Sequence, residues 1–293
     1  NEKIVQINKE ELHMKKYDSI PRYGKQGTRD ILGTEVVVME KLDGANASFG
    51  IIGGELKMFS RNQELNEYNT LRGFYDWVKQ NVNPNLLFPN KIYFGEWLVP
   101  HTVQYSKQYH QKFFLFDIYD AHSNSYHQFD EVENHAAVLK IHTPQVFFKG
   151  VLKDMVDLEQ YVGRSELTEI PNTGEGIVVK DYEGQQFVKI VSDKFKETKY
   201  TKQPSLDRTD IGALIDSVLT PQRVEKLIHK KIDLGLLPAE LDITDTGNVL
   251  KALSSDVVND IFEEEMHIFL DMLRKKISKK TPIVVRELLE QWK

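Results

Sequence analysis

Short runs of β-branched and aromatic residues, separated by turn residues, fill the chain from about residue 36 to residue 191. Runs of this length and composition are typical of strands, and the Gly, Asn and Asp residues between them are typical of turns. Two stretches of helical character, roughly residues 71–81 and 130–139, interrupt the pattern. Strands mixed with a few helices predict an α+β domain with antiparallel sheets. The strand-like runs lie at residues 36–39, 92–94, 113–116, 145–148, 176–179 and 187–190.

Helix signals replace the strand pattern after about residue 200, where residues 201–205 have the composition of a linker. Apolar residues then recur at helical spacing, and a threonine followed by proline is typical of a helix N-terminus. The sequence therefore predicts two domains, one over residues 1–203 and a small all-helical one over residues 204–293. The expected helices cover 210–219, the stretch from Thr220-Pro221 to about Gly235, 255–277, and a final one from Thr281-Pro282.

Composition excludes several classes of site. The 293 residues include no cysteine, which rules out disulfides, thiolate zinc sites and cysteine nucleophiles. No apolar run reaches the length of a membrane span, and we find no signal-peptide pattern, so a cytoplasmic protein without a membrane partner is expected. The net charge of −6 is a weak guide to nucleic-acid binding, which depends on where Lys and Arg cluster.

One stretch after the first strand-like run carries the main chemical signal. It reads Glu40-Lys41-Leu42-Asp43-Gly44-Ala45-Asn46. Alone, Lys-x-Asp-Gly is also compatible with a strand that ends in a turn and a solvated lysine. Further segments follow in order along the chain and strengthen the signal. They contain Ser60-Arg61-Asn62, Glu96 within 93–97, Phe116-Asp117, Glu175 within 174–180, and Lys189 within 187–191.

Taken together and in this order, these segments resemble the nucleotidyltransferase motifs shared by DNA ligases, RNA ligases and messenger-RNA capping enzymes. The resemblance covers about residues 17–197. It implies a nucleotidyltransferase fold, ATP with Mg²⁺ (or Mn²⁺) as cofactors, and Lys41 as the nucleophile that takes up AMP. The implied catalytic residues are Lys41, Glu175 and Lys189, with Glu175 also near the metal. The implied nucleotide-binding residues are Glu40, Asp43, Gly44, Asn46, Arg61, Glu96, Phe116 and Asp117.

Particular roles follow from the same resemblance. Arg61 would contact the nucleotide and its phosphates, Glu96 the ribose hydroxyls, and Lys189 the α-phosphate. Phe116 would stack on adenine, although an aromatic residue in an apolar strand is often simply part of the core. Lysine must be neutral to attack phosphorus, and its ordinary pKa lies near 10.4. We expect burial, magnesium and Lys189 to lower the pKa of Lys41.

The last motif leaves its register open. The family usually has Lys-x-Lys there, whereas this chain reads Phe187-Val188-Lys189-Ile190-Val191. Either Val191 replaces the second lysine, or Phe187 replaces the first. Lys194 or Lys196 could compensate, but both are more typical of solvated surface lysines.

The branch of the family is indicated by Asn46, two residues after Gly44, a pattern found in phage-type RNA ligase 2 and RNA-editing ligases. Phe116-Asp117 and residues 191–197 also resemble that branch. DNA ligases and capping enzymes normally add an OB-fold, a small β-barrel. A helical domain is expected here instead, as in RNA ligase 2 enzymes, where it helps to engage RNA.

A basic surface in the helical domain has two equal interpretations. It could bind phosphates, or it could simply complement the dipole of a helix that carries Glu263-Glu264-Glu265 early and Arg274-Lys275-Lys276 late. The lysines and arginine concerned are Lys226, Lys230, Lys231, Arg274, Lys275, Lys276, Lys279 and Lys280. His101, His110 and His142 show no metal-ligand spacing and are interpreted as ordinary polar residues, although His101 lies close after Glu96.

The sequence thus favours an ATP-dependent RNA ligase that joins 3′-hydroxyl and 5′-phosphate ends through lysine–AMP and an adenylated 5′ end. RNA or an RNA-containing nicked duplex is the expected partner, no obligate protein partner is implied, and a phage origin is compatible. The alternatives are a DNA ligase with an unusual helical C-terminal domain and a non-catalytic RNA-binding relative. A GTP-using capping enzyme is disfavoured by the missing OB pattern. The sequence leaves open the pathway, the oligomeric state and whether the ends lie in a duplex.

Overall fold

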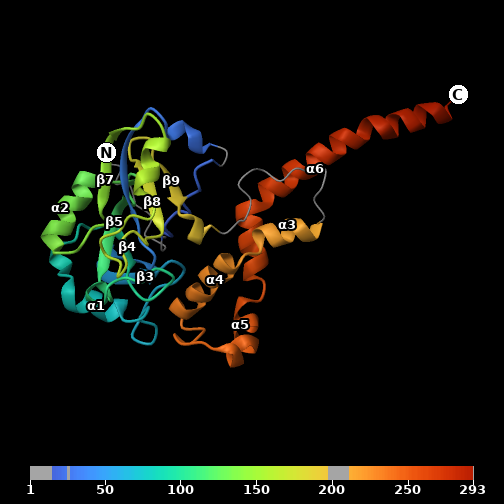
Figure 1. The fold of residues 1–293 in the computed structure, drawn as a ribbon. Coiled ribbons are helices and arrows are strands. Elements are labelled where there is room, and N and C mark those ends of the chain that lie inside the picture. The colour runs from blue at the N-terminus through green and yellow to red at the C-terminus, as the bar shows by residue number, and fades with distance from the viewer. Residues whose placement is uncertain (1–14, 25–26, 197–210, 293) are drawn as a thin grey trace, which may run out of the picture. The chain divides into compact units, whose positions relative to one another are not determined.

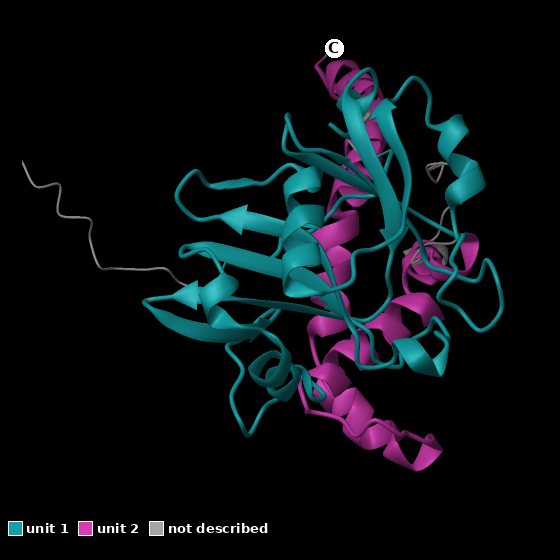
Figure 2. Cartoon of the chain, turned by 90° about the vertical axis from the view of Figure 1, so that its left-hand side faces the viewer, with its two compact units in different colours: residues 1–192 teal, residues 193–293 magenta. Residues whose placement is uncertain are grey.

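The computed structural model describes residues 15–24, 27–196 and 211–292. The chain forms two compact units, Asn1–Ser192 and Asp193–Lys293 (Figure 2). The boundary expected between residues 203 and 204, and the linker expected at 201–205, lie outside the described residues.

Two antiparallel sheets form the first unit, which confirms the predicted α+β class with antiparallel sheets (Figure 1). One sheet has four strands in the order β7-β1-β8-β9, and the other has five in the order β3-β2-β4-β5-β6. The strands of the first sheet are β1 (Glu35–Lys41), β7 (Val146–Val151), β8 (Gly176–Asp181) and β9 (Gln186–Val191). The strands of the second are β2 (Ala45–Ile52), β3 (Glu55–Ser60), β4 (Lys91–Trp97), β5 (Phe113–Asp120) and β6 (Ser125–Tyr126).

Two α-helices of the first unit occur where the sequence predicted helices. They are α1 (Phe74–Asn81) and α2 (Phe129–Leu139). Helix α1 begins three residues later than expected, because Leu71, Arg72 and Gly73 have φ angles of 49°, 54° and 94°. These left-handed conformations cannot be part of a right-handed helix. Phe74 of α1 and Phe129 of α2 are buried in the same core as the aromatic residues of the five-stranded sheet.

Strand β1 is buried on both of its faces. Val37 and Met39 face a large core that includes residues of the five-stranded sheet, and Val36 and Val38 face a second, smaller core. This explains the unbroken apolar run at residues 36–39, since a strand covered on both sides has no polar face. Successive side chains alternate between the faces, so neighbouring residues at the end of β1 must point to opposite sides.

Helices make up the second unit, as the sequence predicts. They are α3 (Ile211–Val218), α4 (Pro221–Asp233), α5 (Thr246–Leu253) and α6 (Asp256–Gln291). Thr220 is the N-cap of α4, with its hydroxyl accepting a hydrogen bond of 3.3 Å from the Arg223 amide. Gly235, just beyond α4, has the positive φ (70°) that is common after a helix end.

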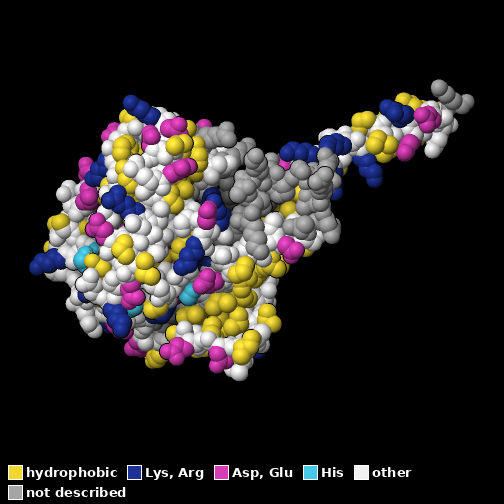
Figure 3. Space-filling view, in the orientation of Figure 1, with side chains coloured by type: hydrophobic (Ala, Val, Ile, Leu, Met, Phe, Trp, Pro, Cys, Tyr) yellow, Lys and Arg dark blue, Asp and Glu magenta, His cyan; other side chains and the backbone are white. Residues whose placement is uncertain are grey.

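The helix expected to begin at Thr281-Pro282 is not separate. Helix α6 runs through Pro282 without ending, so this prediction is wrong. Proline removes one backbone hydrogen bond but is compatible with a helix that remains intact on either side. The Thr281 hydroxyl donates to the Ile277 carbonyl, one turn earlier, at 2.8 Å. Every described residue after Met272 is exposed, including apolar residues visible on the projecting end of α6 (Figure 3).

Within the described ranges 15–24, 27–196 and 211–292, none of the helices combines the length and the apolar character needed to cross a membrane.

Candidate active site

Lys41 is the last residue of β1 and forms an ion pair with Glu175, the residue before β8. The Nζ–Oε2 distance is 2.6 Å, and the two side chains are 24% and 14% exposed. The pairing follows from sheet order, because β1 and β8 are antiparallel neighbours and Lys41 lies opposite Gly176. The lysine and the carboxylate are therefore brought together from positions 134 residues apart, at a point that solvent still reaches.

Within the protein alone the pKa of Lys41 is raised; the lowering expected from the sequence depended on bound magnesium as well as on burial and Lys189, and it stays a prediction. Burial lowers the pKa of this lysine, but the negative charges of Glu175, Glu96 and Asp43 together outweigh burial and raise the pKa above its ordinary value. The expectation counted burial and cations and omitted the carboxylates that the fold gathers around the amine. In this state the amine is protonated, and it must pass its proton on before it can attack.

The turn after Lys41 is held by Glu96 of β4 and by Tyr105 in the connection between β4 and β5. The Gly44 amide donates to Glu96 Oε1 at 3.0 Å, and the Asp43 amide donates to the Tyr105 hydroxyl at 2.8 Å. Gly44 is needed sterically, because a Cβ there would lie 2.5 Å from the Trp97 carbonyl oxygen. The Lys-x-Asp-Gly motif therefore ends in a turn fixed against β4.

Asp43 is bound through both oxygens of its carboxylate. Oδ2 accepts a hydrogen bond of 2.8 Å from the Val103 amide, and Oδ1 lies 3.4 Å from His101 Nδ1. Burial raises the pKa of Asp43, but the interactions with His101 and Val103 outweigh burial and hold the pKa below its ordinary value. Asp43 is therefore a hydrogen-bond acceptor within the turn.

Asn46, Glu96 and Arg61 lie at one end of the five-stranded sheet. Asn46 on β2 is the direct cross-strand partner of Glu96 on β4, so the two side chains share a face. Arg61 follows β3, whose last residue Ser60 pairs with Ala47, which places the arginine at the same end of the sheet. Burial raises the pKa of Glu96 to about 7, although Lys41 and His101 oppose the change. Of these three residues, Glu96 is the one whose charge acts on Lys41.

Lys189 on β9 adds positive charge beside Glu175. Burial raises the pKa of Glu175, whereas Lys41 and, less strongly, Lys189 lower it. The packing between β8 and β9 is unusually close, since a Cβ on Gly176 would lie 2.1 Å from the Ile190 carbonyl oxygen. Glycine after Glu175 therefore lets β9 bring Lys189 near the ion pair.

The other positions of the last motif are apolar in character. Phe187 and Val191 are 9% and 8% exposed, and alternation places them on the same face of β9 as Lys189. Of the lysines considered as substitutes, Lys196 pairs with Asp193 at 2.5 Å, and the Nζ of Lys194 lies 5.6 Å from the centre of the Phe195 ring. Lys189 is thus the lysine of this motif that acts on Glu175.

Phe116 lies at a β-bulge. Phe94 pairs with Asp117 and Gly95 pairs with Leu115, so Phe116 is the extra residue on β5. Bulges change the direction of a side chain and are frequent next to active sites. The ring is partly exposed. Tyr17 packs edge-on at 4.9 Å between ring centres, and Lys180 Nζ lies 4.9 Å from the ring centre.

Asp117 is fully buried in a network of its own, in contrast to the nucleotide contact implied by the sequence. Lys180 Nζ donates to Oδ2 at 2.7 Å, Tyr17 donates to the same oxygen at 2.5 Å, and Tyr182 donates to Oδ1 at 2.7 Å. Lys180 also donates to the Phe116 carbonyl at 3.2 Å. Because β5 and β8 belong to different sheets, this network joins the sheets behind Phe116.

Glu40 points away from Lys41. It shares the face of β1 that carries Val36 and Val38, and it is only 2% exposed. Burial raises the pKa of its carboxyl to about 7, an effect that Ser165 opposes. The Glu40 side chain is therefore on the opposite side of the strand from the lysine and its carboxylates.

His101 and Tyr105 belong to this site and were not found from the sequence, which indicated only an ordinary polar histidine. His101 follows Glu96 by five residues, and that short distance was the one available signal. Both residues reach Asp43 through the connection between β4 and β5, and the path of a connection is not encoded in local sequence.

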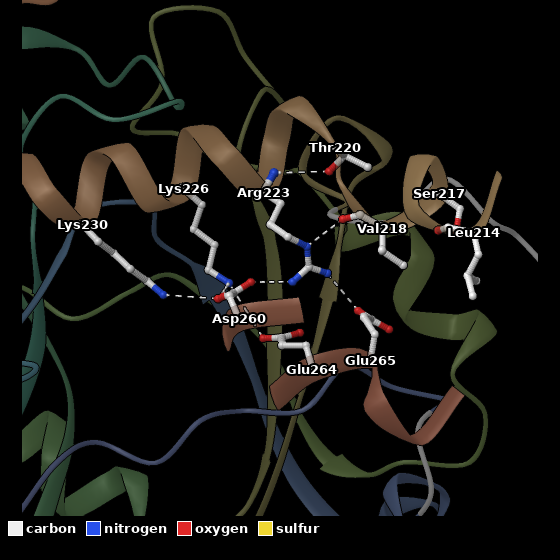
Figure 4. Close-up of polar contacts among 10 residues, drawn as sticks. All are labelled: Leu214, Ser217, Val218, Thr220, Arg223, Lys226, Lys230, Asp260, Glu264 and Glu265. Atoms are coloured by element: carbon white, nitrogen blue, oxygen red, sulfur yellow. Dashed lines mark hydrogen bonds and ion pairs between the residues drawn. The ribbon is translucent and has the colours of Figure 1, made fainter. Parts of the chain in front are cut away.

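Three lysines of the basic surface expected in the helical unit, Lys226, Lys230 and Lys231, form ion pairs within that unit. They lie near a buried arginine that forms ion pairs of its own. Arg223 is fully buried, bonds Asp260 at 2.5 Å and Glu265 at 3.0 Å, and donates to the Val218 carbonyl (Figure 4). Lys226 and Lys230 reach the same Asp260 at 3.4 and 3.6 Å. Lys231 bonds Asp256 at 2.6 Å. Arg274, Lys275, Lys276, Lys279 and Lys280 lie on the exposed part of α6.

A metal ion would need more than the protein provides. In the part of the chain that the structure describes, no three His, Asp or Glu residues are arranged to hold a metal ion. Glu175 and Glu96 are nevertheless carboxylates that lie near one another, since the charge of Glu175 raises the pKa of Glu96 and both charges raise the pKa of Lys41. Magnesium commonly binds one or two carboxylates and takes its remaining ligands from phosphates and water.

Comparison with known proteins gives one family. A family model described as RNA ligase matches residues 34–196, more than half of the 293 residues. A search of curated proteins returns no match. Every residue of the candidate site described above, from Glu40 to Lys189, lies within the matched segment.

Solved structures with a similar fold include the RNA ligase of Naegleria gruberi with PPi, which is 21% identical to this chain with a TM-score of 0.48. A lysine-to-methionine variant of that ligase with AMP and Mn is 20% identical with a TM-score of 0.48. Each comparison covers 62% of this chain and 57% of the other chain, so this chain spans little more than half the length of those proteins.

Proposed function

The chain belongs to the RNA ligase family, and from this premise we propose that it is an ATP-dependent RNA ligase of the phage RNA ligase 2 and RNA-editing type. It joins a 3′-hydroxyl to a 5′-phosphate through a lysine–AMP intermediate and an adenylated 5′ end. The observation that carries the proposal is the ion pair of 2.6 Å between Lys41 and Glu175, placed where a turn, two strands of one sheet and the end of the other sheet meet.

Lys41 acts as the nucleophile. Its Nζ forms a bond to the α-phosphorus of ATP, the bond from that phosphorus to the bridging oxygen breaks, and pyrophosphate leaves. Glu175 Oε2, at 2.6 Å from Nζ, is in place to accept the proton that the ammonium must lose. Burial raises the pKa of Glu175, which makes its carboxylate a better proton acceptor than an ordinary glutamate.

The other polar residues bind and orient. Lys189 offers positive charge to the α-phosphate, and Arg61 offers a partly exposed guanidinium just after the C-terminal end of β3. Asn46 and Glu96 present an amide and a carboxylate on one face, suited to phosphate and ribose hydroxyls.

In the later steps AMP passes to a 5′-phosphate, and a 3′-hydroxyl then attacks that phosphate and releases AMP.

The residues present fit a divalent cation bound together with ATP. Glu175 and Glu96 would hold it, in line with a site that has two neighbouring carboxylates and, among the described residues, no group of three ligands for a metal ion. When bound, Mg²⁺ or Mn²⁺ supplies positive charge that stabilises the phosphates and favours the neutral amine of Lys41. Glu175 would lie beside both the cation and the lysine.

RNA is the proposed substrate, and the helical unit is proposed to help bind it. The exposed basic residues of α6 are the part of that unit suited to phosphates. We also propose that the domain boundary lies near residues 203–204 and that the protein acts in the cytoplasm. A DNA ligase with a helical C-terminal domain is the second candidate, because the site chemistry is common to both.

One experiment tests the enzyme and the substrate together. The protein is incubated with ATP labelled at the α-phosphate and Mg²⁺, and then with nicked duplexes of all-DNA or of RNA at the 3′-hydroxyl side. We expect a labelled protein adduct that is stable in denaturant. We also expect sealing only when the strand that ends in the 3′-hydroxyl is RNA. Equal sealing of all-DNA nicks would favour the DNA ligase. An absent adduct would favour a non-catalytic relative.

Phe116 tests the nucleotide pocket. We expect Phe116→Leu to keep the protein folded, because leucine preserves most of the apolar contacts, and to raise the KM for ATP roughly tenfold. The reason is that stacking of a base on an aromatic ring contributes about 1–3 kcal/mol. Steady-state adduct formation at varied ATP measures the effect. An unchanged KM with a lowered melting temperature would show that the ring serves packing alone.

A further inference from the structure

The three residues after Lys41 carry the chain from one sheet to the other. Lys41 ends β1 in the four-stranded sheet, and Ala45 begins β2 in the five-stranded sheet. So short a connection leaves little freedom, and the direction of the Lys41 side chain depends on how Leu42, Asp43 and Gly44 are held. Anything that fixes this turn also fixes the amine.

Contacts from residues 96–105 hold the turn. Glu96 accepts from the Gly44 amide, Tyr105 accepts from the Asp43 amide, and Val103 donates to the Asp43 carboxylate, at 3.0, 2.8 and 2.8 Å. This segment is itself tied down, since Tyr105 forms a β-bridge with Thr168, in the stretch of chain that leads to Glu175 and β8. The turn is therefore linked directly to Glu96 and, through Tyr105, to the stretch of chain that leads to Glu175.

His101 adds a further contact to the turn after Lys41. Its Nδ1 lies 3.4 Å from Asp43 Oδ1, and its side chain is only 8% exposed. The charge of His101 lowers the pKa of Asp43 and that of Glu96, so the imidazole faces two of the three carboxylates around the lysine. The Asp43 side chain is only 17% exposed, and a carboxylate with so little access to water that loses such a partner would move to find another donor. The lysine amine, whose pKa Asp43 raises and whose charge lowers the pKa of Asp43, is an alternative cation for this carboxylate.

We infer that His101 is a positioning residue for lysine adenylation: it holds the Asp43 carboxylate in the turn and keeps it from pairing with Lys41. The inference rests on the proposed function. Without His101, Asp43 Oδ1 loses its side-chain partner, the turn loosens, and Lys41 is drawn away from the α-phosphate. Misplacement of a reacting group by about 1 Å can cost on the order of a hundredfold in rate.

The test separates the adenylation step from sealing. We expect His101→Ala to slow formation of the lysine–AMP adduct at saturating ATP by about ten- to a hundredfold, with a much smaller change in the KM for ATP. Sealing of a nick whose 5′ end is already adenylated chemically should fall far less, because that reaction does not need attack by Lys41. The full chain is used throughout.

Rescue distinguishes the hydrogen bond from the volume of the ring. His101→Asn places an amide N–H close to the position of Nδ1, and we expect it to restore much of the adduct rate. His101→Leu fills the space without a donor and should be as slow as His101→Ala. His122, an exposed histidine of the same unit, supplies the control, since His122→Ala should form the adduct at the wild-type rate. Thermal melts establish that each variant is folded.

Three results would overturn the inference while leaving the proposed function intact. They are a wild-type adduct rate in His101→Ala, an Asn variant as slow as the Leu variant, or a loss of sealing on the adenylated nick as large as the loss of adduct formation. Absence of any adduct with the wild-type protein would instead overturn the proposed function, and the inference with it.

Discussion

Lys41→Ala should abolish formation of the protein–AMP adduct, with a loss on the order of a thousandfold or more, as is typical when a nucleophile is removed. Lys41→Arg should fail as well, because a guanidinium stays protonated and cannot attack phosphorus. The measurement is the time course of label incorporation from ATP at saturating concentration. Lys112→Ala, at an exposed lysine of the β4–β5 connection, is the matched control and should behave as wild type.

Removal of Lys41 also leaves Glu175 without its ion-pair partner, so a structural effect must be separated from a chemical one. The melting temperature of each variant and sealing of a chemically adenylated nick serve this purpose. A folded Lys41→Ala variant that forms adduct at the wild-type rate would show that another residue is the nucleophile. Mapping of the adduct to a different lysine would lead to the same conclusion.

The second large effect concerns stability. Lys180→Met should lower the free energy of unfolding by about 3–5 kcal/mol, the range found when one partner of a buried ion pair is removed. Lys180 and Asp117 are 1% and 0% exposed. Burial lowers the pKa of Lys180, although the charge of Asp117 opposes this. Methionine would leave the Asp117 charge with the neutral hydroxyls of Tyr17 and Tyr182 as its side-chain donors among the described residues.

A double variant provides the control for this prediction. Asp117→Asn combined with Lys180→Met removes both charges, and we expect it to be more stable than Lys180→Met alone, because no charge is then buried without a partner. Urea unfolding of the wild type, both single variants and the double variant gives the coupling between the two residues. A double variant no more stable than Lys180→Met would show that the unpaired charge of Asp117 is not the cause of the destabilisation. The Lys180–Asp117 ion pair would then not be what stabilises the contact between the sheets.

The same experiment links stability to nucleotide use. Lys180 also donates to the Phe116 carbonyl, and Phe116 lies at the bulge of β5. Under conditions where both are folded, the double variant should therefore use ATP less well than the wild type. The network acts on the nucleotide pocket through the backbone of Phe116, since Asp117 itself has no exposed surface.

The sequence by itself determined the local features of this protein. Strand-like runs separated by turn residues, with a few helical stretches, were sufficient to predict the α+β class, because strands and turns are encoded locally. Thr220-Pro221 was sufficient to predict where α4 begins. Lys41, Glu96, Glu175 and Lys189 were predicted as site residues from the resemblance of ordered segments to a known family. Local signals can mislead where a longer element dominates, as in the helix that continues through Pro282.

The tertiary structure alone decided which of these residues meet and with what charge. Glu175 reaches Lys41 from 134 residues away because β8 lies beside β1, and sheet order is not written in any one strand. Asp117 contacts Lys180 and Tyr182 because the other sheet packs beside β5. His101 contacts Asp43 because the connection between β4 and β5 passes the turn after Lys41. The pKa of Lys41 rose for the same reason: a pKa depends on the sum of burial and all nearby charges, and three carboxylates converge on this lysine only after folding.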